Sequence, residues 1–309
     1  MSDLADDSVT KITFSDEVGL PGEVDPRRLA ELRRRLGEVR GRIAAAARAA
    51  GRDPAELTLL AVSKTRPAAD VLALHALGVR DFAENREQEA TPKVAAVTKA
   101  LSGAAGSTIG PPDSPAAAGP AAARRDLPEG PVWHFVGQLQ RNKARAVAGW
   151  AHWVHSVDRP RLVEALSRAA TERDRVISVC IQVLLDPFVP EAGGQPAESL
   201  SDAGKAMAAG RSPGGRGGAL PADVPALAEL VARSEGLRLA GVMAVAPLGA
   251  PPRPAFALLR QVSERLCAEH PEATVISAGM SGDLEAAVAE GATHLRIGTA
   301  LFGERPPVP

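Results

Sequence analysis

The sequence predicts an α/β protein in which parallel strands close into a single (β/α)8 barrel. Eight short apolar segments alternate with helical patterns along the 309 residues. Most of these segments are apolar along their length, as expected of parallel strands that are covered by helices. Two segments rich in Gly, Ala and Pro interrupt the alternation, and about 250 residues remain without them, the usual size of one such barrel. A doubly wound open sheet would look similar strand by strand, but the strand count favours the barrel.

The chain opens with a polar segment followed by a long helix. Residues 1–24 show no sustained periodicity, and we expect a flexible N-terminal tail. Asp25 and Pro26 suit the N-cap and the first position of a helix, and apolar residues then recur at helical spacing up to Gly51. We expect this helix to cover the floor or the flank of the barrel.

Eight strands are predicted after this helix, each a short, mainly apolar run bounded by polar or turn residues. They are placed at Leu57–Val62, Val79–Phe82, Val132–Leu139, Trp153–Val157, Val176–Leu185, Leu237–Val245, Thr274–Ala278 and His294–Ile297. Helical patterns separate most of them. These helices are placed at Pro67–Leu77, from Glu87 to about Ala100, and at Arg141–Ala148, Arg161–Arg173, Pro254–Glu269, Asp283–Ala289 and Thr299–Phe302.

The two interruptions span residues 101–128 and 189–219. Neither contains enough apolar residues to bury and order itself, so both are predicted to be flexible surface insertions. The barrel is therefore predicted to be one domain that spans residues 25–305. The second insertion follows the fifth strand, at the same end of the barrel as the expected site, and is placed to cover part of its mouth.

The composition excludes several classes of protein. A net charge of -1 gives no overall attraction to nucleic acid or to an anionic membrane. No apolar run is long enough to span a bilayer, and the acidic start of the chain is unlike a signal peptide, so a cytoplasmic location is expected. The basic stretch at residues 140–145 is ordinarily a solvated helix face, which argues against a nucleic-acid role.

The two cysteines, Cys180 and Cys267, have no metal-binding or redox spacing, and buried reduced thiols are expected. No motif with metal-ligand spacing is present, so no metal is predicted. The sequence contains no tyrosine, which removes one class of catalytic acid.

Lys64 lies just beyond the first predicted strand. The carboxyl ends of parallel strands are where α/β proteins bind ligands. A lysine in this position is ordinarily a surface residue whose stem packs against the protein. Alternatively, its amine has a depressed pKa and forms a Schiff base with a carbonyl cofactor or substrate. Lys64 alone does not decide between these interpretations.

The last two predicted strands end in turns that suit a phosphate group. Residues 278–283 pass from a strand through two glycines and Ser281 into a helix. Residues 296–300 pass from a strand through Gly298 and Thr299 into another helix. Small residues let backbone amides approach an anion, and a helix dipole adds positive charge. The loops after strands seven and eight of such barrels frequently bind phosphate. For either turn alone, a turn glycine and a helix N-cap would be a sufficient explanation.

Lys64 and the two turns together indicate pyridoxal 5'-phosphate (PLP). This cofactor has both an aldehyde and a phosphate, so it would span a lysine and a phosphate cradle across the barrel mouth. Arg296, on the eighth strand beside the cradle, could face the pyridine nitrogen of the cofactor. By itself, an arginine in this position would be interpreted as part of an ion pair in the barrel wall.

Six segments together resemble the YggS/PROSC family of pyridoxal phosphate homeostasis proteins. The similarity runs from about Leu29 to Arg305 and is interrupted only by the two insertions. The segments are AVSKTRP, FAENREQE, WHFVGQLQRNKA, HSVDR, GVMAVAP and SAGMSGDLEAAVAEGATHLRIGTALFGER.

The resemblance implies a TIM barrel similar to the N-terminal domain of alanine racemase, the type III fold of PLP proteins, without a second domain. It also implies the roles of individual residues. Lys64 would form the Schiff base, and Arg296 would meet the pyridine nitrogen. The remaining contacts implied by the family are Asn85 and Met243 around the ring, and Ser281, Gly282, Gly298 and Thr299 at the phosphate.

Three positions depart from the family pattern. Ala83 replaces a usual Gly, Gln138 replaces a position that is frequently basic or His, and Ala278 replaces a common Met. None of the three is an implied cofactor contact, so the expectation of PLP binding is unchanged and only details of the pocket are affected.

Because this chain has no tyrosine and no second domain is expected, we hypothesise a non-catalytic protein that binds PLP and regulates its supply, with indirect effects on amino-acid and keto-acid balance. A racemase needs acid or base groups on both faces of the substrate carbon, and alanine racemases use the cofactor lysine and a tyrosine of the partner subunit. PLP-dependent apoenzymes are the implied partners, and a monomer is expected because the family's barrel closes its own site.

The alternative is a PLP-dependent racemase or lyase. In that case His134, His155 or Cys180 would supply the second acid or base group. His134 and His155 are placed near strand ends, although a histidine in such a position is more often a hydrogen-bonded structural residue.

Overall fold

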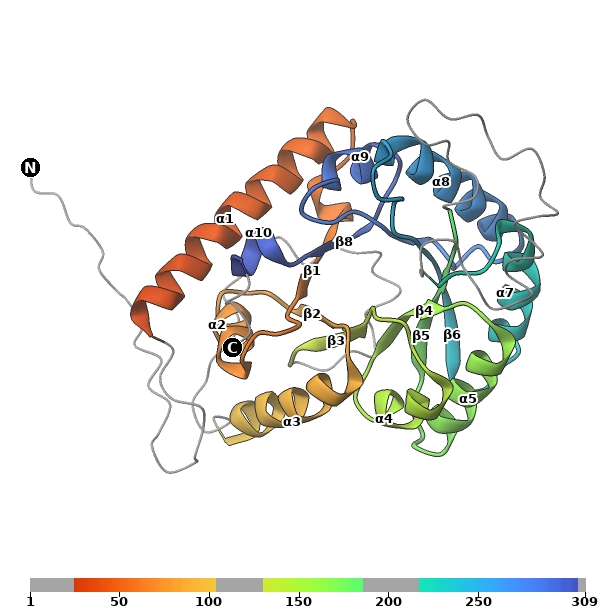
Figure 1. Ribbon diagram of the computed structural model, residues 1–309, viewed down its shortest axis with the longest axis horizontal. Coiled ribbons are helices and arrows are strands. Elements are labelled where there is room, and N and C mark those ends of the chain that lie inside the picture. Colours follow the sequence, from red (N-terminus) through yellow and green to blue (C-terminus); the bar gives the residue numbers. More distant parts are fainter. Residues whose placement is uncertain (1–24, 104–129, 186–216, 305–309) are drawn as a thin grey trace, which may run out of the picture.

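The computed structural model describes residues 25–103, 130–185 and 217–304. Its eight parallel strands form a closed barrel in the order β1 to β8, with β1 paired to both β2 and β8 (Figure 1). The predicted barrel is therefore confirmed. The predicted N-terminal tail lies outside the described residues, as do 104–128 and 189–216 of the two predicted insertions.

The strands are β1 Thr58–Val62, β2 Asp81–Glu84, β3 Val132–Phe135, β4 Trp153–Val157, β5 Ile177–Gln182, β6 Leu237–Met243, β7 Val275–Ser277 and β8 His294–Ile297. The α-helices are α1 Pro26–Ala49, α2 Ala68–Ala76, α3 Glu87–Gly103, α4 Ala144–Ala148, α5 Pro160–Thr171, α7 Val224–Ala232, α8 Pro252–Glu269, α9 Leu284–Ala289 and α10 Thr299–Phe302. Short 3-10 helices are η2 Pro54–Glu56, η4 Arg141–Lys143 and η6 Pro221–Asp223.

The second strand lies two residues later than predicted. Gly78 has φ of 84°, and the amide of Val79 donates back to the carbonyl of Leu74 at 2.9 Å, so Val79 belongs to the end of α2. The strand continues instead to Glu84, a charged residue that the sequence pattern excluded. Glu84 is buried there because it forms an ion pair with Lys93 of α3.

Other boundaries also differ from the predictions. The helix α7 was not predicted, because it follows closely on the second predicted insertion. The strand β3 ends at Phe135, four residues early, since Gly137 already approaches the backbone of the β2–α3 loop. The helix α3 continues to Gly103, three residues into the first predicted insertion.

The helix α1 packs on the flank of the barrel and not on its floor. It contacts α2, α9 and α10. Figure 1 shows it along the outside of β1 and β8. The helix after β8 has only four residues, so α1 completes the ring of helices at this position. One helix from the start of the chain therefore covers the seam where the barrel closes.

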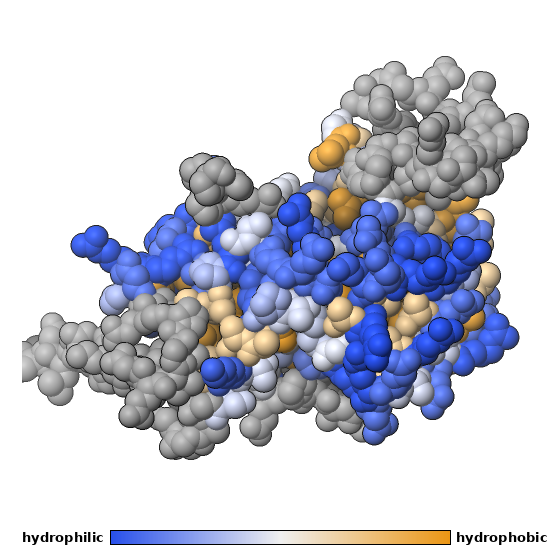
Figure 2. Space-filling view, turned by 60° about the horizontal axis from the view of Figure 1, so that its bottom comes forward, coloured by the Kyte–Doolittle hydropathy of each residue, from blue (hydrophilic) through white to orange (hydrophobic). Residues whose placement is uncertain are grey.

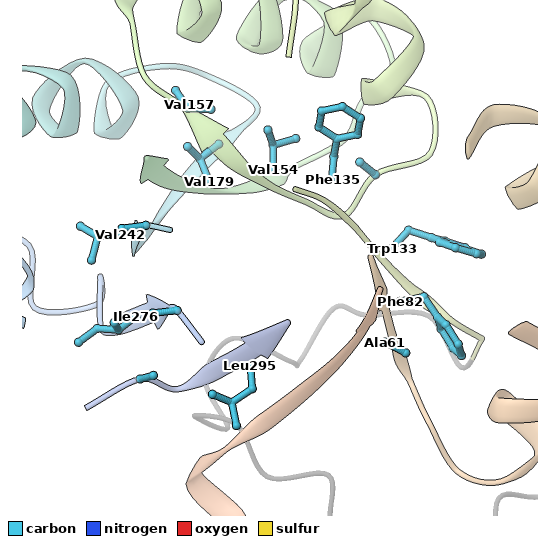
Figure 3. Packing of buried hydrophobic residues seen from close by; sticks show 14 of the residues in the cluster. Ala61, Phe82, Trp133, Phe135, Val154, Val157, Val179, Val242, Ile276 and Leu295 are labelled. Atoms are coloured by element: carbon cyan, nitrogen blue, oxygen red, sulfur yellow. The ribbon is translucent and has the colours of Figure 1, made fainter. Parts of the chain in front are cut away.

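Alternate residues of each strand face opposite sides of the barrel wall. Those that face outward, such as Ala61, Phe82 and Leu295, pack under the helices in the main apolar core (Figure 3). Those that face inward form two smaller clusters. One comprises Leu60, Val62 and Ala83 with Val136 beside them, and the other comprises Val132, Trp153, Cys180, Ala240, Met243 and Val275.

The outer surface is largely hydrophilic on the face shown in Figure 2, with apolar side chains in small patches. None of the described helices has the length and apolar character needed to cross a membrane.

A half-buried histidine, His152, predicts how stability depends on pH. The Nδ1 atom of His152 accepts a hydrogen bond from the amide of Trp133 at 2.9 Å. Burial and, to a smaller extent, the charge of Arg175 lower the pKa of His152 from an ordinary value of 6.5 to about 4. The unfolded chain therefore takes up a proton that the folded protein excludes, and folding stability falls as the pH falls from 6.5 towards 4.

We expect the melting temperature to drop over this pH range in the wild type and to drop less in His152→Asn. The asparagine Oδ1 keeps an acceptor for the Trp133 amide but does not titrate, and all other groups contribute equally to both proteins. Thermal unfolding followed by circular dichroism at a series of pH values measures the two slopes. Equal slopes would contradict a role for His152.

Candidate functional site

The predicted site residues lie at or just beyond the carboxyl ends of five strands of the barrel. Lys64 follows β1, Asn85 follows β2, Met243 is the last residue of β6, and the remaining residues belong to β8 or to the turns after β7 and β8. Because all strands are parallel, these ends share one edge of the barrel. The fold therefore brings the predicted residues to one mouth.

Lys64 lies in a turn two residues beyond the end of β1, and its side chain is partly buried. Ser63 before it is fully buried, and the Ser63 amide donates to the carbonyl of Ala83 on β2 at 2.9 Å. Thr65 after it has φ of 63°, in the left-handed region that β-branched residues rarely adopt. The backbone on both sides of Lys64 is thus tightly constrained.

Asn85 and Met243 lie across the barrel from each other, after β2 and at the end of β6. A Cβ atom at Gly137 would come within 1.9 Å of the Asn85 carbonyl oxygen and 2.6 Å of its side-chain oxygen, so only glycine allows this packing. Met243 is 2% exposed and packs inside the barrel with Cys180. Both residues are thereby fixed in place at the mouth.

The turns after β7 and β8 are joined directly. The amide of Ala300 donates to the hydroxyl oxygen of Ser281 at 3.2 Å. Arg42 of α1 donates to the carbonyl of Ser281 at 3.2 Å and supports the β7–α9 turn from outside. The amide of Met280 donates to the Asp283 carboxylate at 2.5 Å and tightens the same turn.

Three glycines in these turns have different surroundings. Gly279 has φ of 89°, and a Cβ atom there would lie 2.7 Å from the Cβ of Ala287. At Gly282 a Cβ atom would have no neighbour within 4 Å, and at Gly298 it would lie 3.6 Å from Val62. Gly279 is therefore required by the fold, whereas Gly282 faces open space and Gly298 lies at ordinary contact distance from Val62.

The helices that follow these turns are short. The helix α9 has six residues and α10 has four, so few peptide dipoles are aligned behind either turn. An anion here would depend on hydroxyl groups and turn amides more than on the helix dipole that the sequence analysis invoked.

Arg296 projects into the barrel and is 6% exposed. Its guanidinium group donates to the Ser277 carbonyl at 2.6 Å, to the Ser277 hydroxyl at 3.0 Å and to the Ala244 carbonyl at 2.8 Å. Burial lowers the pKa of Arg296 to about 10, although the nearby Asp283 opposes this. It therefore remains a cation, held in one orientation by its neighbours on β7 and after β6.

Two of the candidate second acid or base groups were predicted near strand ends. His134 is the penultimate residue of β3, whereas His155 lies in the middle of β4, and both are fully buried inside the barrel. The Nε2 atom of His134 lies 3.1 Å from the Asp81 carboxylate, and its Nδ1 atom lies 2.9 Å from Nε2 of His155. Trp153 stacks on the His134 ring at 5.5 Å. These histidines form part of the barrel interior.

The hydrogen-bond chain fixes which nitrogens carry protons. A carboxylate only accepts, so a neutral His134 donates from Nε2 to Asp81 and accepts at Nδ1 from the Nε2 proton of His155. Burial, reinforced by nearby positive groups, lowers the pKa of His155 well below its ordinary value. Burial also raises the pKa of the Cys180 thiol to about 12. Neither His155 nor Cys180 is suited to exchange protons with a substrate at neutral pH.

The basic segment after β3 is a solvated surface, as the sequence suggested. A groove of about 290 Å³ between α4 and α5 is lined by exposed arginines, among them Arg141 and Arg168, together with Glu164 and Glu172. Charges of both signs therefore share this face. Within the described ranges, no cluster of three or more His, Cys, Asp or Glu residues could hold a metal ion.

Sequence reasoning missed the polar groups that support the site from behind. Glu84 and Lys93 form an ion pair beneath the Lys64 turn, and Ser277 anchors Arg296. The position of Glu84 directly before Asn85 was the signal in the sequence that could have identified this ion pair. The pair was overlooked because Lys93 lies on the following helix.

The chain is similar to named proteins over most of its length. It is 39% identical over 289 residues to the pyridoxal phosphate homeostasis protein of Mycobacterium tuberculosis, a match that covers 91% of this chain and 95% of that protein. Residues 207–306 match the family described as alanine racemase, N-terminal domain.

Solved structures show the same similarity. PipY of Synechococcus elongatus with PLP bound is 32% identical, with a TM-score of 0.59, and the match covers 88% of this chain and all (100%) of that chain. An alanine racemase of Streptomyces coelicolor is 17% identical with a TM-score of 0.56, and the match covers 89% of this chain and 58% of the racemase. At that identity the racemase shows the shared fold alone.

The two turn glycines predict contrasting effects on stability. Gly279→Ala should lower the free energy of unfolding by about 1–3 kcal/mol, because it forces an alanine into a left-handed conformation and against Ala287. Gly282→Ala should change it by no more than about 0.5 kcal/mol, since the site is open and exposed. Urea unfolding of both variants measures the difference, and equal losses would contradict this assignment.

Proposed function

This chain belongs to the family of pyridoxal phosphate homeostasis proteins, and on that premise we propose that it binds pyridoxal 5'-phosphate through Lys64 and regulates the supply of the cofactor. One observation supports this above the others. Closure of the barrel places the lysine turn after β1 next to the two joined turns after β7 and β8. A cofactor with an aldehyde at one end and a phosphate at the other matches this arrangement.

The phosphate group would be held by residues of the two joined turns. Ser281 and Thr299 supply hydroxyl groups, and Gly282 and Gly298 leave room for the phosphate oxygens to approach the backbone. The hydrogen bond between the Ser281 hydroxyl and the Ala300 amide keeps the two turns at a fixed separation. The residues present therefore fit a phosphate group.

The ring would lie between Asn85 and Met243, with Arg296 directed at its nitrogen. Arg296 is a cation whose hydrogen bonds to Ser277 and Ala244 prevent it from turning away. A guanidinium group can only donate, so it favours an unprotonated ring nitrogen as its acceptor. When bound, the cofactor supplies an aldehyde that reacts with an amine and a ring that withdraws electrons. Beside Arg296 that withdrawal is weaker, because the ring nitrogen stays neutral.

We propose a carrier and not a racemase or lyase. The 309 residues contain no tyrosine, and the candidates His155 and Cys180 are buried in the barrel with unsuitable pKa values. The second proton-transfer group that a racemase requires is therefore not supplied by these side chains. In this proposal, a cytoplasmic monomer gives up its cofactor to PLP-dependent apoenzymes.

Lys64→Ala should abolish covalent attachment of the cofactor. Wild type incubated with pyridoxal 5'-phosphate should show an absorbance band near about 420 nm, as expected of an amine-linked cofactor, and borohydride should fix the label on the peptide that contains Lys64. Lys99→Ala is the matched control, because Lys99 is exposed on α3. If saturated wild type shows no band, or if the Lys64 variant keeps it, the proposal is wrong.

The carrier proposal also predicts negligible turnover. Loaded wild type should racemise L-alanine no faster than the Lys64→Ala variant does with free cofactor, because no second base is available. The rate of D-alanine formation by chiral chromatography measures this. Fast racemisation by wild type that disappears in the Lys64 variant would favour the enzyme instead.

A further inference from the structure

A buried ion pair lies directly behind the Lys64 turn. Glu84, the last residue of β2, is fully buried, and Lys93 on α3 is 8% exposed. The Nζ atom of Lys93 lies 2.7 Å from Oε1 of Glu84. Burial raises the pKa of Glu84, and the adjacent Lys93 opposes this shift. Two charges are therefore kept out of water at a position that apolar side chains could also fill.

The hydrogen bonds of this pair extend to the residues on both sides of Lys64. Before the lysine, the Ser63 carbonyl accepts from Lys93 at 2.7 Å, and the Ser63 hydroxyl donates to Glu84 at 2.7 Å. After the lysine, the Thr65 amide donates to the Glu89 carboxylate. Glu89 also accepts from Lys93, at 3.0 Å. One connected network thus holds the backbone on each side of Lys64.

The network also explains the unusual conformation of Thr65. A threonine with φ of 63° is strained and persists only where its surroundings hold it. The bond from the Thr65 amide to Glu89 is available in this conformation. Without this hydrogen bond, the turn would be free to adopt an ordinary backbone geometry. The side chain of Lys64 would then point in another direction.

A buried ion pair is weak evidence for stability, since the cost of removing two charges from water can exceed their attraction. Its hydrogen bonds to Ser63, and through Glu89 to Thr65, indicate a different purpose. We infer that Glu84, Lys93 and Glu89 are positioning residues, which fix the Lys64 turn so that the lysine amine faces the barrel mouth and captures the cofactor. This inference rests on the proposed function of Lys64.

The experiment compares Glu89→Ala and Lys93→Met with Lys99→Met as the control. Lys99 lies on the same helix as Lys93 but is exposed. Glu89→Ala leaves the Glu84–Lys93 pair intact and removes the hydrogen bond to the Thr65 amide. This variant therefore tests the positioning role even if Lys93→Met does not fold. Hydrogen–deuterium exchange of the cofactor-free protein reports on the turn itself, and the rise of the covalent absorbance band reports on capture.

We expect both variants to exchange the amides of residues 63–66 faster than wild type and to capture the cofactor about 10- to 100-fold more slowly, the effect of a small misplacement of a reacting group. Lys99→Met should match wild type in both measurements. If Glu89→Ala captures the cofactor at the wild-type rate, or slows capture without faster exchange at the turn, the positioning role is wrong. If wild type itself captures no cofactor, the proposed function of Lys64 fails first.

Discussion

The pairing of β1 with β8 is the constraint on which the candidate site depends. Thr58 pairs with His294 and Ala61 with Ile297, so the first strand and the last are adjacent in the wall although most of the chain separates them. Lys64 follows one of these strands and the Gly298 turn follows the other. The helix α1 covers the same seam from outside and reaches the β7–α9 turn through Arg42. Loss of this pairing would separate the lysine from the Gly298 turn without altering either segment.

Buried polar groups then fix the side chains at the mouth through hydrogen bonds to specific partners. Arg296 is held by Ser277 and by a carbonyl after β6, and the Lys64 turn is held by the pair formed by Glu84 and Lys93. Such groups are costly to bury unless they are hydrogen-bonded, so they specify one arrangement where apolar residues would permit several. The rigid barrel wall and these anchors together present a preformed site.

Much of the fold was predictable from the sequence because buried parallel strands are recognisable as apolar runs. Residues 153–157 and 294–297 were placed with their observed bounds. The error at β2 arose because a charged residue, Glu84, is buried in the strand by a partner nine positions later that local pattern does not reveal. The position of Lys64 at the carboxyl end of a strand was likewise predictable, because it depends on one strand only. The hydrogen bonds that link Asp81, His134 and His155 were not, because they need three strands brought together by the fold.

A crystal structure of the protein grown with pyridoxal 5'-phosphate tests most directly whether one cofactor molecule spans the barrel mouth. We expect electron density continuous with Nζ of Lys64, with the phosphate between Ser281 and Thr299 and the ring nitrogen facing Arg296. A cofactor bound at full occupancy elsewhere on the protein, or at the mouth with its phosphate away from the two joined turns, would contradict the proposed site.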